Sequence, residues 1–318
     1  MFEALAGHAS RWQHLDLNVA NGTPDRVLES LVACFANAEA PILRTLRVRT
    51  LYISSRTAYS TPTTLPRGCS MLQHLTICGN PIRTIPTGSL DAIATLHVRL
   101  TGWVLDNLWF ILCATYQLDT LRLSGVSGRQ YQLPIASQVT PLLCPKLRRI
   151  EANDLGMCYL YGLVYHLDIT KVQEFIVRHP SNLGWHPLGD GTLLPFFRES
   201  VTTLIIRRGR LEELGEDWAR RLGALNRVRE FHDEDGGTRN DFWETVDEED
   251  IWPDLEVVHS KTLPMENTPL TRIPALEALG ELIVHRKQRS GQGVCRIREV
   301  YVDAENDTRE WLAGLIAE

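Results

Sequence analysis

A short pattern, apolar-x-x-apolar-x-apolar, recurs along the whole chain and constrains its fold more than any other sequence feature. Eleven copies are present, and they begin at Trp12, Leu43, Leu72, Ile93, Leu118, Leu147, Val172, Val201, Val228, Leu255 and Ile297. The second apolar slot holds Leu15, Leu46, Leu75, Leu96, Leu121, Ile150, Phe175, Leu204, Phe231, Val258 and Val300. The third slot is polar at Asp233 and Ser260 and apolar in the other copies. Most intervals between copies measure 21 to 31 residues, close to the length of a leucine-rich repeat.

This pattern predicts one short strand in each copy. Successive side chains of a strand point to opposite faces, so the second and third slots would face the core and the residues between them would face outward. One copy has too little apolar surface to fold alone, whereas stacked copies bury it together. We therefore expect an α/β leucine-rich-repeat solenoid, or horseshoe, with a parallel β-sheet on its concave face and irregular helices and loops on its convex face. Residues 1–318 would form this single domain of about 11 degenerate repeats.

Helical spacing of apolar residues predicts helices between some of the strands. The expected helices cover residues 24–36, 104–116, 213–225 and 275–287. The last of them lies in the longest interval, 42 residues between Leu255 and Ile297, which has room for an extra helix.

Net charge, cysteine content and the lack of long apolar runs limit which partners and which cellular location we expect for this protein. The net charge of −6 lacks the basic excess of a general nucleic-acid binder, so nucleic acid is not expected as a partner. The seven cysteines form no CxxC pair and several lie in apolar runs, which predicts free, buried thiols in a reducing compartment, the cytoplasm or nucleus. The N-terminus has no signal-peptide pattern and no run of 18 apolar residues occurs, so we expect neither secretion nor a membrane span.

Motifs for catalysis or metal binding are absent from the sequence. It contains no HExxH, Walker loop, GxSxG or complete GxGxxG. His232 and His259 occupy the same outward slot of two copies, but we find no carboxylate set at a fixed spacing beside them, and this predicts surface histidines without a ligand role. We expect no enzyme activity, no cofactor and no metal site.

The outward slots provide a candidate partner-binding surface, because the strand face of a repeat array is rigid and displays parallel columns of side chains. Arginines recur in these slots, at Arg47, Arg49, Arg99, Arg122, Arg178 and Arg207. Ile176 and Ile205 fall in outward slots of neighbouring copies, and we expect them about 5 Å apart. An apolar pair ringed by arginines is typical of a binding hot spot. Two alternatives are that loops cover the pair or that the register is shifted there by one residue.

Residues 233–250 form an acidic segment with nine acids and one base, so this segment carries −8 and the rest of the chain +2. The segment also contains Phe242 and Trp243 and is followed by Trp252. It could dock a basic partner, fold back on the arginines as an autoinhibitory clasp, or be a solvated surface loop.

The third copy, Leu72 to Asn80, matches the leucine-rich signature LxxLxLxxN. The opening HASRWQHLDL at 8–17 resembles the first strand after the F-box in fungal F-box/leucine-rich-repeat proteins, and the ending, with 276–287 before CRIREVYV at 295–302, is similar to theirs. The resemblance implies the substrate-recognition part of a Skp1–cullin–F-box ubiquitin ligase. The F-box that docks Skp1 would precede Arg11, where only ten residues stand. We therefore expect either that an upstream segment supplies it or that this member only binds.

Together these features predict a protein–protein interaction scaffold that holds a protein substrate on its concave face, with Skp1 as a partner only if an upstream F-box exists. The alternative is a stand-alone leucine-rich-repeat module, a ligand sensor or a nucleic-acid-associated protein, with no ligase link. Neither prediction names the substrate, because concave residues vary while the scaffold stays the same.

Overall fold

The computed structural model divides into two compact units, Met1–Asp168 and Ile169–Glu318, and each is described by itself. The structure describes residues 7–19, 37–50, 67–79, 90–100, 111–125, 144–153, 167–178, 197–207, 215–234, 238–261, 272–303 and 306–317, with the isolated residues 4, 6, 30, 34, 108, 156, 157, 160, 163 and 164. The predicted helix at 24–36 falls largely outside this part of the chain. Of the one at 104–116 the structure describes 108 and 111–116, and 108 and 111–113 are helical.

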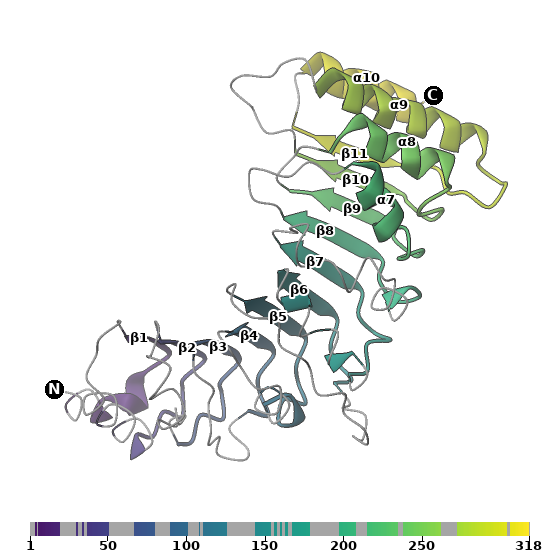
Figure 1. Cartoon of the computed structure of the whole chain (residues 1–318). Coiled ribbons are helices and arrows are strands. Elements are labelled where there is room, and N and C mark those ends of the chain that lie inside the picture. Colours follow the sequence, from purple (N-terminus) through teal and green to yellow (C-terminus); the bar gives the residue numbers. More distant parts are fainter. Residues whose placement is uncertain are drawn as a thin grey trace. The chain divides into compact units, whose positions relative to one another are not determined.

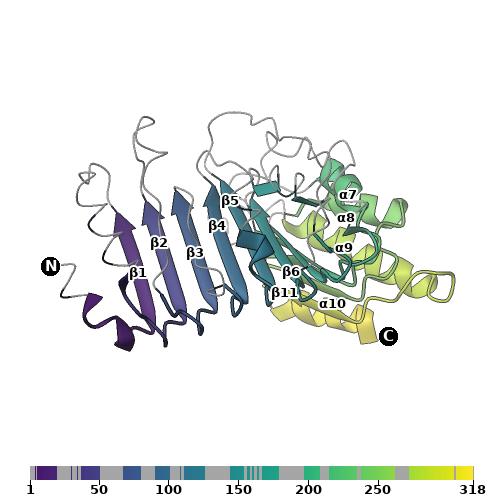
Figure 2. The same ribbon diagram turned by 90° about the horizontal axis from the view of Figure 1, so that it is seen from below.

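Among its described residues, the first unit contains a short 3-10 helix, η1 (Ala9–Arg11), and six strands. The strands are β1 (His14–Val19), β2 (Thr45–Thr50), β3 (His74–Gly79), β4 (Thr95–Leu100), β5 (Thr120–Gly125) and β6 (Arg149–Asn153). They pair in chain order and in parallel, and Figure 2 shows β1 to β5 side by side with the same direction. Residues of the second slot form one row across the sheet: Leu15, Leu46, Leu75, Leu96, Leu121 and Ile150.

The second unit contains five strands and four helices in its described part. The strands are β7 (Glu174–Arg178), β8 (Thr203–Arg207), β9 (Glu230–Asp233), β10 (Val257–Ser260) and β11 (Glu299–Val302). The helices are α7 (Glu216–Leu222), α8 (Asn240–Glu248), α9 (Arg272–Gln288) and α10 (Asn306–Ala317), of which α9 and α10 lie next to each other (Figure 1). The strands are again parallel, with Phe175, Leu204, Phe231, Val258 and Val300 in one row.

The strand predictions are therefore confirmed in all eleven copies, and the second slot faces the core as expected. Leu46, Leu75 and Leu96 are at most 1% exposed in the first unit, and Leu204 and Phe231 are fully buried in the second. The polar third-slot residues Asp233 and Ser260 are also buried, and Asp233 accepts a hydrogen bond from the Thr238 hydroxyl. We call the opposite side of each sheet, formed by the residues between these slots, the outward face.

Helices pack on the core side of the second unit. The expected helices at 213–225 and 275–287 are present as α7 and α9, although their ends differ by several residues. Phe231 of β9 contacts the rings of Phe242 and Trp243 from α8, with centroids 5.7 Å away in both cases, and that of Trp252 at 5.1 Å. These aromatic contacts place α8 against the core side of β9 and leave the outward face on the other side.

The acidic segment is part of this helical layer. Phe242 and Trp243 of α8 are buried, and Asp247 forms an ion pair of 2.5 Å with Arg289, which follows α9. Glu249, which follows α8, pairs with Arg220 of α7 at 2.6 Å. The predictions of a loop and of a clasp on the outward arginines are therefore wrong for residues 240–250, because this stretch is mainly a helix with a buried apolar side and Asp247 and Glu249 pair with Arg289 and Arg220. Docking of a basic partner by this segment stays a prediction.

The class is thus α/β, with eleven parallel strands among the described residues. None of the described helices is long and apolar enough to cross a membrane. None of the described cysteines forms a disulfide, and Cys69 and Cys144 are buried. Cys158 lies outside the described residues.

Candidate functional site

The outward column of the second unit passes through the middle of its strands. The parallel register aligns Ile176, Ile205, His232, His259 and Tyr301, one from each of β7 to β11. The column thus changes from aliphatic to aromatic side chains along the sheet.

The isoleucine end of this column is not a surface. Ile176 and Ile205 are register partners, as the sequence predicted, but Ile176 is 0% and Ile205 7% exposed. Their neighbours Phe175 and Val177 are buried as well, so both faces of the sheet are excluded from solvent at β7. The predicted exposed apolar pair is therefore wrong, and the cause is coverage of the outward face there rather than a shift of register.

The other end of the column forms a stack of three rings. His232 and His259 stack with centroids 4.0 Å apart and planes within 6° of parallel. His259 and Tyr301 continue the stack at 4.4 Å and 9°. The spacing follows from the fold, because neighbouring strands lie about 4.8 Å apart and identical register positions face the same way.

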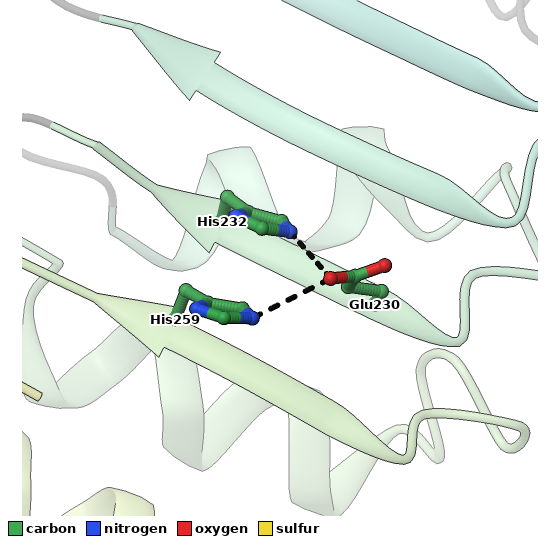
Figure 3. Close-up of side chains that lie close together, drawn as sticks. All are labelled: Glu230, His232 and His259. Atoms are coloured by element: carbon green, nitrogen blue, oxygen red, sulfur yellow. Dashed lines mark hydrogen bonds and ion pairs between the residues drawn. The ribbon is translucent and has the colours of Figure 1, made fainter. Parts of the chain in front are cut away.

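Glu230 joins the two histidines at one edge of the stack. Its Oε1 accepts a hydrogen bond of 2.8 Å from Nε2 of His232 and lies 3.4 Å from Nε2 of His259. Figure 3 shows both rings turning their nitrogen edge toward this oxygen, on the side of β9 and β10 away from the helices. The other carboxylate oxygen, Oε2, accepts a 3.4 Å hydrogen bond from the Thr203 hydroxyl of β8.

Protonation in this cluster reflects its partial burial. Desolvation lowers the pKa of His259, and the adjacent His232 lowers it further, against the opposing attraction of Glu230. The pKa of Tyr301 is raised, chiefly because its hydroxyl donates a 2.6 Å hydrogen bond to Glu299. His259 is thus held neutral near pH 7, and Tyr301 keeps its proton.

A surface depression of about 610 Å³ adjoins the ring stack. His232, His259 and Tyr301 line it, together with charged residues from the ends of the strands and from α10: Glu234, Lys261, Asp303 and Arg309. The depression therefore combines flat aromatic edges with charges of both signs.

The expectation that His232 and His259 lack a carboxylate partner is wrong. Glu230 precedes His232 by two residues on the same strand, and period-2 alternation puts both side chains on the outward face. That spacing was readable in the sequence, as was the adjacency of the two histidines in the repeat register. Tyr301 occupies the same register position on β11, but the sequence alone did not predict that it stacks on His259.

The arginines of the first unit lie on its outward face. Arg47 and Arg49 of β2 and Arg99 of β4 are exposed, and Cys78 of β3 lies between Arg49 and Arg99 in the register. Arg49 pairs with Asp16 of β1 at 3.3 Å, whereas no ion pair within the described part of the chain involves Arg47 or Arg99.

The remaining predicted arginines are more strongly engaged. Arg122 of β5 pairs at 3.0 Å with Glu151, whose side chain is 4% exposed. In the second unit, Arg207 donates a 3.0 Å hydrogen bond from Nη2 to Glu234, and Arg178 is half-buried. The sequence-predicted set is therefore split: four arginines lie in the first unit and two in the second, and only part of the set is free to meet a partner.

Comparison with known proteins gives no family for this chain. No model of a known protein family matches it, and no curated protein sequence matches it either.

Proposed function

We propose that the chain is a leucine-rich-repeat scaffold that binds a protein partner on the outward face of its sheets. In the proposed horseshoe this face is the concave one. The biological role that we propose is substrate recognition for an F-box-type ubiquitin ligase, and this part rests on the sequence resemblance alone.

The observation that carries the binding proposal is the exposed outward face of β2 to β4. Other elements usually cover both faces of a parallel sheet in a protein. A polar, solvent-exposed face on this parallel sheet is therefore unusual, and binding of a partner would explain it. Val48 is 5% exposed and Val98 0% exposed on the core side, whereas Arg47, Arg49 and Arg99 are exposed on the other. Rigid strands hold these cations in fixed positions, which suits a partner surface with acidic groups.

The test is affinity purification from the native host with matched charge-reversal variants. Arg47→Glu with Arg99→Glu changes the outward face, whereas Arg11→Glu with Arg67→Glu makes the same charge change at exposed positions off the strands of the same unit. We expect the first pair to abolish recovery of a partner that wild type and the second pair both retain. Equal recovery with both pairs would remove the proposal.

The ligase role has a separate test. Skp1 should co-purify with the full-length product of the gene, and this recovery should be unaffected by the outward-face variants. Partner binding without Skp1 would instead support the stand-alone binding module.

A further inference from the structure

We propose that Glu230, His232 and His259 bind a zinc ion on the outward face of β9 and β10. One ligand atom from each of these side chains lies within 4.8 Å of the other two. The inference rests on this geometry and does not depend on the proposed protein-binding function.

The distances between the ligand atoms suit a tetrahedral ion. Zinc binds imidazole nitrogen and carboxylate oxygen at roughly 2.0–2.2 Å, so two ligand atoms of a tetrahedral site are about 3.4 Å apart. Oε1 of Glu230 is 2.8 Å from Nε2 of His232 and 3.4 Å from Nε2 of His259. The 3.4 Å edge already has the length that such a site needs, whereas the 2.8 Å edge must lengthen. The two rings must also tilt out of their near-parallel stack, because an imidazole nitrogen binds a metal ion in the plane of its ring.

The kind of donor favours zinc over the harder cations. Calcium and magnesium take oxygen ligands, whereas two imidazole nitrogens and one carboxylate oxygen form a ligand set common for zinc. Three protein ligands leave the fourth position of a tetrahedron open. Since the cluster is on the outward face, with side chains 22% to 36% exposed, a water molecule can reach that position.

Neighbouring side chains hold the three ligands in place. Thr203 donates its hydroxyl to Oε2 of Glu230, which leaves Oε1 directed at the histidines. Tyr301 stacks on the far side of the His259 ring, so this ring can tilt only toward His232. Such supporting contacts orient metal ligands and raise affinity.

The local charge also favours a cation. Glu299 of β11 acts on His259 in addition to Glu230, so two carboxylates contribute negative potential at the proposed site. Without an ion, the same cluster is a pair of histidines that share one hydrogen-bond acceptor. Only a direct measurement of zinc binding distinguishes these two states.

The experiment is calorimetric titration of Zn²⁺ into the full chain after treatment with a chelator. Two variants remove a ligand atom and preserve packing: His259→Phe keeps the ring stack, and Glu230→Gln keeps the side-chain size. The control is His285→Ala, which removes an exposed histidine of the same unit that pairs with Asp247 outside the cluster.

We expect wild type and His285→Ala to bind one zinc ion per chain with equal affinity, and each cluster variant to lose at least about tenfold. Circular dichroism of the variants checks that they remain folded. Wild-type binding no tighter than that of folded His259→Phe and Glu230→Gln would overturn the proposal, as would an equal loss in His285→Ala.

Discussion

The guanidinium of Arg286 donates a 2.8 Å hydrogen bond to the backbone carbonyl of Trp252 inside the second unit. Its other terminal nitrogen donates at 2.6 Å to the carbonyl of Ile251. Arg286 is 0% exposed, and burial lowers its pKa to about 10, so it remains charged at pH 7. The two carbonyls belong to a turn in which Asp250 and Trp252 have positive φ angles of 50° and 54°, a conformation that is unfavourable for a residue as bulky as tryptophan.

Replacing Arg286 by leucine should therefore destabilise the protein strongly. The buried carbonyl of Ile251 loses the donor that Arg286 provides, at about 1–3 kcal/mol, whereas that of Trp252 keeps the N–H of Leu255. Chemical denaturation measures the loss, with Arg298→Gln as control, because Arg298 is 71% exposed and its pair with Glu256 should contribute at most about 1 kcal/mol. Similar stabilities of the two variants would mean that Arg286 does not hold this turn.

Gly280 should resist enlargement because helix α10 crosses it. A Cβ atom at Gly280 would clash with the indole ring of Trp311, so Gly280→Ala must displace this ring from its place against α9. We expect a loss of about 1–3 kcal/mol in the free energy of unfolding. Gly314→Ala in α10 is the matched control, since its Cβ meets nothing within 4 Å and helix propensity favours alanine. A control variant less stable than Gly280→Ala would contradict this packing.

The thiols of Cys69 and Cys144 should be unreactive in the folded protein. Burial raises the pKa of each to about 11, so about one molecule in ten thousand carries the thiolate at pH 7. Mass spectrometry after iodoacetamide treatment should find both unmodified in buffer and alkylated in urea. Rapid modification of either one without denaturant would show that its surroundings are more open than described.

Glu234 should titrate below its ordinary range because Arg207 binds its charged form. The hydrogen bond from Arg207 is the main cause of the lowered pKa. A carboxylate with a lowered folded-state pKa stabilises the fold above its unfolded pKa, and this contribution is lost as pH falls through the folded value. An NMR titration should show the pKa of Glu234 rising in Arg207→Gln, and an unchanged value would rule out the pair as its cause.

The strands could be predicted from sequence because period-2 alternation and burial act together within each short segment. Leu75 and Leu96 fill the second slot of their copies and are register partners in the structure. Coverage of the outward face could not be predicted in this way. Ile176 alternates correctly and is still buried, since what covers a strand is decided by residues distant in the sequence.

Helix α8 was not predicted, because the acidic residues of this segment favoured a loop over the helical spacing of its apolar residues. Phe242, Trp243 and Val246 form a buried side of the helix, but they stand among nine acids in residues 233–250. The histidine cluster was missed for a different reason. Two facts together indicate the cluster: Glu230 precedes His232 by two residues on β9, and His259 of β10 is the register partner of His232. Neither fact alone indicates a site.

The most direct test of the proposed binding surface is photo-crosslinking in the native host. A photoreactive amino acid replaces Arg47 on the outward face in one variant and Arg67, exposed off the strands, in another. We predict a covalent adduct with a specific partner protein from position 47 and none from position 67. The same adducts from both positions, or an adduct from position 67 alone, would contradict the assignment of the outward face as the binding surface.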